Sequence, residues 1–522
     1  MAIGGKEGTS VDGQGNFTIV RGSGAFDRMF WLYHRLGLQS NVIVSAKYSS
    51  GNGRTLTRQM VVSALRTCIE KHSRLRVVGV VRPSPRKRRH ILDLATLNQI
   101  DLEQCIKWVE DPEGKGVTSD LLEMMHSEWD FQDDEPNRPF FKLFIIGGTD
   151  VVFVFHHMLC DGISGYIFHR EFLAALNAMP DTIPVSMPST VMYTEKGTTI
   201  LRDEIDVGYE CIREGKPWGP QMLGLALSFV FWVLAPLLLP RDRIFFSDFP
   251  RTTSHIMDAT ARVTDAKDRT VTRVSTLRIP AEKMRKILQA CRSRQTTFTP
   301  LLNTMLLTTL SADYYPKAWI GGTRFSRDLR PQFPMKKFGP VPSAGALTNI
   351  NTGGSKAHAL GKFRRVATNR GEANKLGGIR YAVDKELAWK LTREQKRHMD
   401  DALEANIGGM MSIDCGEDLE TFVSEKMSMM GIALRYSMLI SNIGPFPGPI
   451  KGTEGEWSVT DTQFSAGSVH TGQCTNGIIF DVAGIKGGDT VVNATWVDGI
   501  TSRDMVEGLL AATLGRLEAL AE

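Results

Sequence analysis

The strongest pattern along the chain is a run of five apolar residues that leads directly into two histidines. Residues 151–155 are β-branched or aromatic, which predicts a buried strand. His156 and His157 follow this strand, and Asp161 and Gly162 lie a few positions further on. Because neighbouring side chains of a strand point to opposite faces, the two histidines should face different ways. They are not expected to bind one metal ion together, and no metal site is predicted.

Strand and helix periodicities continue on both sides of this run. Residues 140–147 and 149–155 predict a hairpin that turns at two glycines, and residues 165–178 predict a helix that leads away from the histidines. Further strands are predicted at 42–48, 75–81, 270–279, 319–326, 434–442, 478–485 and 490–496. Further helices are predicted at 26–36, 57–72, 117–129, 280–292, 297–312 and 504–521. This mixture of strands and helices predicts an α/β fold.

Length and composition predict more than one domain. A chain of 522 residues with 42% hydrophobic content is too large for one small domain, and two domains are the sensible expectation. We divide it into a disordered, glycine-rich N-terminus (1–16), a first domain with the two histidines (17–195), a crossover (196–262) and a second domain (263–522).

Charge and cysteine content exclude several classes of protein. The 62 basic and 57 acidic residues leave a net charge of only +5, which argues against a nucleic-acid-binding protein. The seven cysteines are scattered without a Cys-x-x-Cys pair, which indicates a reducing compartment and argues against structural zinc. One basic run, residues 86–89, is interpreted as a solvated hairpin tip, with a contact for anionic lipid or for cofactor phosphates as the alternatives.

The residues after the predicted strand suit the movement of one proton. Histidine titrates near neutrality and can serve as a general base. Asp161 can hold a histidine, or the backbone around it, in a working orientation, and Gly162 allows the chain to turn sharply. A single histidine at the end of a strand is more often structural. Two histidines followed by Asp-Gly at this spacing favour a catalytic role.

The motif His-His-x-x-x-Asp-Gly resembles the active-site signature of the CoA-dependent acyltransferase superfamily. That superfamily includes chloramphenicol acetyltransferase, plant alcohol acyltransferases and the condensation domains of peptide synthetases. Stretches at 20–21, 26–28, 36–37 and 42–48, and the later Ser441-Asn442-Ile443-Gly444, resemble the fungal alcohol acetyltransferase family. The Asp-Phe-Gly-Trp-Gly motif of the plant members is not found, which again favours the fungal branch. The resemblance implies two chloramphenicol-acetyltransferase-like domains, each a mixed sheet flanked by helices, with an active-site channel between them.

The resemblance also implies roles for the motif residues. It places the general base at the second histidine, His157, and makes His156 a packed, hydrogen-bonded neighbour. Asp161 is expected to act through structure, by pairing with a nearby basic group that fixes the loop. The implied donor is free acetyl-CoA or another short acyl-CoA, with no permanently bound cofactor.

Residues outside the motif are candidates for contacts with the reacting groups. Asn442 and Ser441, with Asn349 as second choice, are candidate donors to an oxyanion; the alternative is that each caps backbone groups of its loop. Arg324, Arg327 and Arg330 are candidate partners of the CoA phosphates; Arg327 and Arg330 are, as an alternative, structural.

The function predicted from these features is O-acylation of a small, apolar metabolite alcohol, such as a terpenoid alcohol. N-acylation of an amine, such as a sphingoid base, is the alternative within enzymes. A binding protein that has kept the fold and lost turnover is the alternative outside them. The protein is expected to be a cytoplasmic monomer.

An apolar segment at residues 222–240 raises the question of membrane contact. Residues 223–239 carry no charge and would form a helix about 26 Å long, slightly short of a hydrocarbon core of about 30 Å. A single span would also separate the two domains that form the predicted site. Either the segment lies at a membrane surface, anchored by Trp232, Arg241 and Arg243, or it is a crossover buried against the protein. In the first case the enzyme would be peripheral on the endoplasmic reticulum or a lipid droplet.

Overall fold

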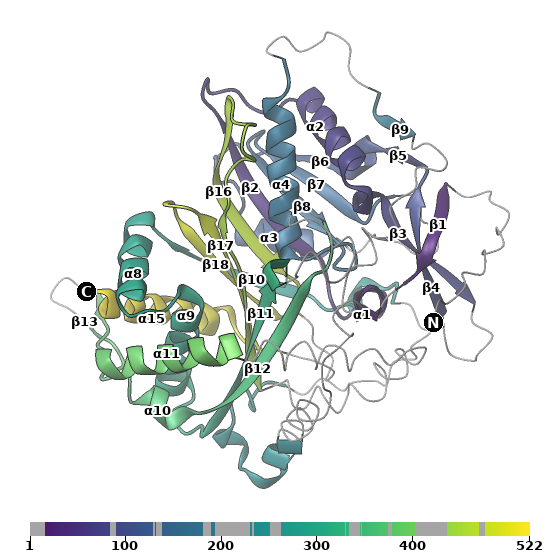
Figure 1. The fold of residues 1–522 in the computed structure, drawn as a ribbon. Coiled ribbons are helices and arrows are strands. Elements are labelled where there is room, and N and C mark those ends of the chain that lie inside the picture. Colours follow the sequence, from purple (N-terminus) through teal and green to yellow (C-terminus); the bar gives the residue numbers. More distant parts are fainter. Residues whose placement is uncertain are drawn as a thin grey trace.

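The computed structural model describes most of the chain as two lobes of sheet and helix (Figure 1). The described residues are 16–23, 25–83, 90–128, 131, 138–180, 189–193, 230–231, 234–250, 263–328, 330–332, 345, 347–373, 378–401, 436–468 and 476–522. The basic run at 86–89, the N-terminus before residue 16 and most of the crossover, including Trp232, lie outside these ranges.

The first lobe is built on a five-stranded sheet that has the order β16-β2-β8-β7-β6 within the described residues. All six residues of its central strand β8 are buried, as the apolar run predicts. β8 pairs antiparallel with β7 across Gly147 and Gly148, whose φ angles of +57° and +69° suit a tight turn, and this confirms the predicted hairpin. The strands are β2 (Val42–Ser50), β6 (Ile106–Val109), β7 (Phe141–Ile146), β8 (Asp150–Phe155) and β16 (Trp457–Ala466).

The second lobe is built on a six-stranded sheet, again counted within the described residues, with the order β10-β18-β17-β15-β11-β12. β15 runs parallel to both of its neighbours, and the remaining pairs are antiparallel. The strands are β10 (Thr272–Ile279), β11 (Ile320–Asp328), β12 (Asn351–Ala359), β15 (Ser437–Phe446), β17 (Ile479–Ile485) and β18 (Thr490–Val497). Two mixed sheets flanked by helices confirm the predicted α/β class.

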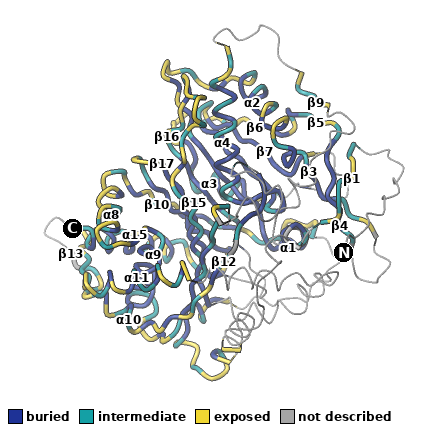
Figure 2. Tube along the Cα trace, in the orientation of Figure 1, coloured by how far each residue is buried: buried dark blue, intermediate teal, exposed yellow. Residues whose placement is uncertain are grey.

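Helices cover the outer faces of both sheets (Figure 1). In the first lobe α2 (Arg58–Lys71) packs on α4 (Gly162–Asn177), which lies against β2 and β16. In the second lobe α9 (Phe298–Thr309) packs against β15 and is surrounded by other helices. These are α8 (Ala281–Ser293), α10 (Leu360–Arg364), α11 (Lys385–Asp401) and α15 (Arg503–Ala521). Figure 2 shows that the strands form much of the buried interior and that the exposed residues lie on loops, on turns and on the outer sides of the helices.

Helix α3 (Ser119–His126) connects the two lobes. Its buried Met125 belongs to a cluster that contains Val152 of β8 and Val274 of β10. Its Glu123 accepts hydrogen bonds from Arg273 Nη1 of β10, at 2.9 Å, and from the guanidinium of Arg503 at the start of α15. The lobes are therefore joined by apolar packing and by an ion-pair cluster.

Strand β16 is the second connection between the lobes. It lies in the part of the chain assigned to the second domain, yet it pairs antiparallel with β2 and forms an edge of the first sheet. The other strands assigned to that domain lie in the second sheet or in the small β13-β14 ladder. The boundary at residue 263 remains a prediction. β16 follows this boundary in the sequence but pairs with a strand that precedes it.

Smaller elements complete the described structure. β1 (Phe17–Gly22), β4 (His90–Leu97) and β3 (Val77–Pro83) form a three-stranded sheet, and α1 (Ala25–Arg35) follows β1. β5 (Gln99–Asp101) pairs with β9 (Val191–Tyr193), and β13 (Glu372–Ala373) pairs with β14 (Ile379–Arg380).

The end of the apolar segment is described at residues 230–231 and 234–240. The chain is helical at 230–231 and 234–238, and Ala235 is buried against Ile244 and Tyr436. Nowhere in the described ranges is a helix both long and apolar enough to cross a bilayer.

Candidate active site

His156 is a packed core residue at the end of β8. Its ring is stacked on Phe140, with centroids 5.3 Å apart, and lies 4.4 Å from the ring of His34. Its Nδ1 accepts a hydrogen bond of 2.9 Å from the backbone N–H of Met158, which closes the turn after the strand. Burial lowers the pKa of His156 well below its usual value, and the neighbouring His34 and His157 lower it further. The residue is therefore neutral at physiological pH.

His157 lies in the turn beyond the end of β8, and its imidazole lies flat on the ring of Phe30 from α1. The two centroids are 3.6 Å apart and the planes are within 6° of parallel. Burial lowers the pKa of His157, while backbone groups, Asp161 and Asn349 oppose the shift. The net effect leaves a neutral imidazole near pH 7, which is the form that a general base requires. Its Nδ1 is buried and has no hydrogen-bond partner among the described residues.

Asp161 is the N-cap of α4, and it organises the loop between β8 and this helix. Its Oδ1 accepts hydrogen bonds from the backbone N–H and the hydroxyl of Ser164, both at 3.0 Å. Its Oδ2 accepts a hydrogen bond of 2.9 Å from the N–H of Ile350. Burial alone would raise the pKa of Asp161, but the charge of Arg330 and these hydrogen bonds outweigh burial, so the pKa is lowered. The carboxylate is therefore charged, and its hydrogen bonds hold the loop rather than a substrate.

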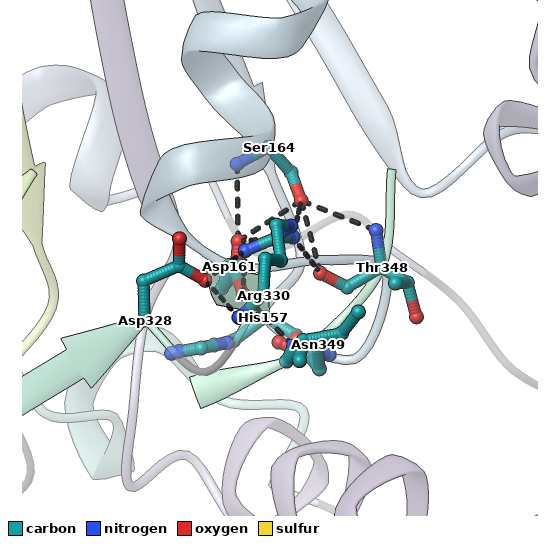
Figure 3. Close-up of polar contacts among 8 residues, drawn as sticks. His157, Asp161, Ser164, Asp328, Arg330, Thr348 and Asn349 are labelled. Atoms are coloured by element: carbon teal, nitrogen blue, oxygen red, sulfur yellow. Dashed lines mark hydrogen bonds and ion pairs between the residues drawn. The ribbon is translucent and has the colours of Figure 1, made fainter. Parts of the chain in front are cut away.

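Arg330 is the basic residue that forms the expected ion pair with Asp161. Both nitrogens of its guanidinium end lie 3.1 Å from the two carboxylate oxygens of Asp161, and only 4% of either side chain is exposed. Arg330 also donates to Asp328 at 2.9 Å and to the carbonyl of Thr348 at 2.8 Å (Figure 3). A guanidinium that is buried and occupied in this way fits the structural alternative. The geometry does not support Arg330 as a partner of the CoA phosphates.

Two glycines allow the second lobe and β2 to approach the start of α4. A Cβ at Gly162 would lie 2.9 Å from Ile443 Cγ2, and a Cβ at Gly165 would lie 2.3 Å from Val44 Cγ2. Gly162 therefore serves close packing against β15, because its backbone is helical and makes no unusual turn. The contact with Ile443 also brings the Ser-Asn-x-Gly element next to the His-His-x-x-x-Asp-Gly motif.

The three oxyanion candidates lie in different settings. Asn349 donates from Nδ2 to the carbonyls of His157 and Met158, at 2.8 and 3.2 Å, so both of its N–H groups hold the loop of the general base (Figure 3). Asn442 caps its own loop through Oδ1, which accepts from Gly444 N–H at 2.8 Å, and it donates to Thr299 at 2.9 Å. Ser441 is half-buried on β15, and no hydrogen bond of its hydroxyl is found within the described ranges. The N–H groups of Asn349 are thus occupied, whereas Asn442 keeps one N–H and Ser441 keeps its hydroxyl, and the assignment of an oxyanion donor remains a prediction.

The comparison with known families supports the catalytic interpretation of this site. A sequence model of the alcohol acetyltransferase family matches residues 97–487, which is most of the chain and contains the motif. This chain belongs to the alcohol acetyltransferase family.

Individual relatives of this family member agree with the assignment. A probable alcohol acetyltransferase of Fusarium pseudograminearum is 23% identical over 515 residues, which cover 95% of this chain and 94% of the relative. A probable alcohol acetyltransferase of Aspergillus fumigatus is 29% identical over 187 residues, which cover 32% of this chain and 39% of the relative.

Solved structures show the same fold. The trichothecene 15-O-acetyltransferase TRI3 of Fusarium sporotrichioides superposes with a TM-score of 0.65 at 14% identity, and the match covers 98% of this chain and 97% of that one. The first condensation domain of the CDA synthetase superposes with a TM-score of 0.57 at 11% identity over 96% of both chains. These similarities confirm the predicted two-lobed chloramphenicol-acetyltransferase-like fold.

The other two arginine candidates of this alcohol acetyltransferase family member lie on β11, which leads to Arg330. Arg327 donates to the carbonyl of Met399 at 2.9 Å and lies 3.9 Å from Asp400, with 30% of its side chain exposed. Arg324 is half-buried, and within the part of the chain that is described it has no ion pair. Both retain donors for a phosphate, and their assignment to CoA remains a prediction.

Sequence reasoning missed several residues of this site. Phe30 reads as an ordinary core residue of a helix, and only the stacked ring of His157 reveals its role. Asp328 and Thr348 carry no motif of their own, although both contact Arg330. Ser164 had a local signal, because it stands three positions after a possible Asp N-cap.

Proposed function

We propose that this chain is an O-acyltransferase that moves an acetyl or another short acyl group from acyl-CoA to the hydroxyl of a small apolar metabolite, such as a terpenoid alcohol. The observation that carries the proposal is His157, a neutral imidazole held between Phe30 and the Asn349-bound loop. Membership of the alcohol acetyltransferase family supports the type of reaction. The structural neighbour that acetylates a trichothecene hydroxyl supports a metabolite alcohol as acceptor.

The proposed reaction is a direct transfer without an acyl-enzyme. Nε2 of His157 takes the proton of the acceptor hydroxyl while the oxygen attacks the thioester carbonyl carbon of acyl-CoA. The carbonyl electrons move onto oxygen and form a tetrahedral oxyanion. When the carbonyl re-forms, the C–S bond breaks, and the imidazolium returns its proton to the CoA thiolate. His157 is thereby neutral again, and the products are the ester and free CoA.

Two features of the chain would lower the barrier of this reaction. A positioned general base typically contributes about 10²–10⁴-fold in rate. A donor aimed at the oxyanion contributes about 10²–10³-fold, and the proposed donors are the free N–H of Asn442 and the hydroxyl of Ser441. The contact between Ile443 of the Ser-Asn-x-Gly element and Gly162 at the start of α4 supports these two donors, because it brings them near the motif that contains His157. The two substrates would meet in a channel between the lobes, acyl-CoA from one end and the acceptor from the other.

The setting that we propose follows from an apolar acceptor. The protein would act as a cytoplasmic monomer with peripheral contact to the endoplasmic reticulum or a lipid droplet through residues 222–240. The exposed leucines at the described end of this segment support that contact. Acyl-CoA would be a co-substrate, with no cofactor bound permanently.

The test is release of CoA thiol from acetyl-CoA and longer acyl-CoA, measured against a panel of alcohols and amines. We expect thiol release with alcohols, a matching ester by mass spectrometry, and initial-rate patterns of a ternary complex. Thiol release with amines alone would replace the proposal by N-acylation. Tight CoA binding without thiol release would indicate a binding protein. Parallel double-reciprocal lines, together with an acylated protein mass, would refute direct transfer.

A further inference from the structure

The described end of the apolar segment presents an unusually apolar surface to solvent. Val230 and Leu234 are 47% and 44% exposed, and Leu237 and Leu238 are each 75% exposed. Leu234, Leu237 and Leu238 stand three and one residues apart, which places them on one face of the helical residues 234–238. We call these three leucines, together with the exposed Val230, the leucine face. It lies in the teal segment at the bottom of Figure 1, where the tube of Figure 2 is coloured as exposed.

The opposite side of the same segment is anchored to the second lobe. Ala235 is buried in a cluster with Ile244 and Tyr436, and Leu239 packs against this cluster. Ile244 in turn forms a bridge with Ile320, the first residue of β11. The leucine face therefore points outward because its helix is fixed from behind. The buried-crossover interpretation of the segment fails for this part of it.

Cationic and aromatic side chains border the leucine face. The guanidinium of Arg243 lies 4.9 Å above the ring of Trp319, which is 53% exposed. Arg243 also donates to the carbonyl of Lys317. Lys317, two residues before Trp319, and Arg241, two residues before Arg243, are themselves exposed. Asp242 lies 3.6 Å from Arg243 Nε, and the exposed Asp248 accepts a hydrogen bond from Tyr315 six residues further along. Among the described side chains the rim has three cations and these two carboxylates, so it is net positive, and it carries a tryptophan.

We propose that the leucine face and this rim dock on the surface of an anionic bilayer. Leucines that insert below the headgroups, with tryptophan at the interface and cations among the phosphates, are the chemistry of an interfacial helix. A second copy of the chain is a poorer occupant. A two-fold dimer through the leucine face would bring the two positively charged rims together, and like charges would repel.

The docking surface is separate from the catalytic residues. β11 begins at Ile320, beside the surface, and ends at Asp328, which contacts Arg330. At about 3.3 Å per residue the strand spans roughly 26 Å. Substitutions on the leucine face should therefore leave the chemistry intact. The inference rests on the proposed function in one respect: docking would bring the active site to acceptors dissolved in lipid.

Flotation of the full chain with vesicles tests the proposal. We expect the wild type to float with vesicles of phosphatidylcholine and phosphatidylserine, to float less with phosphatidylcholine alone, and to lose binding as salt screens the rim. Leu237→Asp/Leu238→Asp should lower the partition coefficient at least 100-fold. The matched control, Tyr193→Asp/Ile379→Asp, changes two equally exposed apolar side chains elsewhere and should float like the wild type.

Three outcomes would overturn the proposal. The first is a wild type that stays at the bottom of the gradient with both kinds of vesicle, and the second is a leucine variant that floats as well as the control. The third is a concentration-dependent dimer in size-exclusion chromatography that Leu237→Asp/Leu238→Asp dissociates, which would make a second copy the occupant. Thiol release with a water-soluble alcohol, measured without vesicles, separates these results from the proposed function. It should be unchanged in the leucine variant.

Discussion

Replacement of Arg330 by methionine should destabilise the protein through one buried carboxylate. Methionine keeps much of the apolar stem of arginine but removes the charge that faces Asp161. The carboxylate would keep its hydrogen bonds from Ser164 and Ile350, yet it would be buried without a counter-ion. The carbonyl of Thr348 would also lose a donor. The loop that carries His157 should therefore loosen as the protein loses stability.

The size of the effect can be worked out from the burial of the pair. Breaking a buried ion pair by removing one partner costs about 3–5 kcal/mol. The remaining hydrogen bonds of Asp161 favour the lower end, about 3 kcal/mol. An unfolding entropy of about 2.1 cal/mol/K per residue gives roughly 1.1 kcal/mol/K for a chain of 522 residues, so the midpoint should fall by about 3 °C.

Thermal unfolding at a fixed scan rate measures this shift, since a chain of this size need not refold. The matched control is Arg327→Met on β11, the strand that leads to Arg330. Its ion pair of 3.9 Å is partly exposed and is worth at most about 1 kcal/mol, so the midpoint should fall by about 1 °C or less.

The pH dependence of the shift identifies its cause. In the wild type the pKa of Asp161 is lowered, so the pair stabilises the fold above the unfolded carboxyl pKa of about 3.9, and this is lost only as pH falls through the lower folded value. Without Arg330, burial should raise the pKa of Asp161, and its protonation should reduce the destabilisation of the variant as pH falls from near 7 toward 5. The difference in unfolding midpoint between wild type and Arg330→Met should therefore decrease on acidification. A difference no larger than that of Arg327→Met, or one that increases in acid, would refute the reasoning.

Further predictions concern the base and its surroundings. His157→Ala should lower kcat by about 10²–10⁴-fold with CoA binding and melting temperature retained, and a variant with more than a tenth of wild-type kcat would remove His157 from the role of base. Because burial lowers the pKa of His157, the neutral base persists to lower pH, and the acid limb of kcat/KM should lie below the ordinary histidine pKa of about 6.5; a limb above it would contradict the assignment. Phe30→Leu should lower kcat about two- to tenfold with little change in KM, whereas Phe30→Tyr should retain the activity; equal losses in both would show that stacking is not the reason. Gly165→Ala should cost about 1–3 kcal/mol in unfolding free energy, because its Cβ would lie 2.3 Å from a Val44 methyl, and Gly361→Ala, where no atom lies within 4 Å, is the control that should not.

Local signals in the sequence were sufficient for the motif and for most elements around it. The apolar run at 151–155 and the two glycines before it predict β8 and its hairpin, since strand and turn depend on neighbouring residues. The same applies to α4, whose N-cap Asp161 stands in the motif itself.

Contacts between distant segments were not predictable in this way. A basic partner for Asp161 was expected, but three arginines were open and none of their sequence neighbours marks Arg330 as the buried one. Phe30 lies more than a hundred residues before His157, and its apolar side chain fits an amphipathic helix equally well. β12 and β16 escaped detection because glycines or polar residues interrupt the apolar alternation of each strand.

The pairing of β16 with β2 has a consequence for biosynthesis. Ser45 of β2 pairs with Gln463 of β16, which the ribosome adds 418 positions later. At about 5–20 residues per second the delay is roughly 20–80 s, during which the nascent first sheet has an open edge at β2. An unpaired edge strand is a template for association with other chains. Truncation before residue 457 should therefore yield an insoluble product, and productive synthesis should depend on chaperones that cover this edge until the last strands emerge.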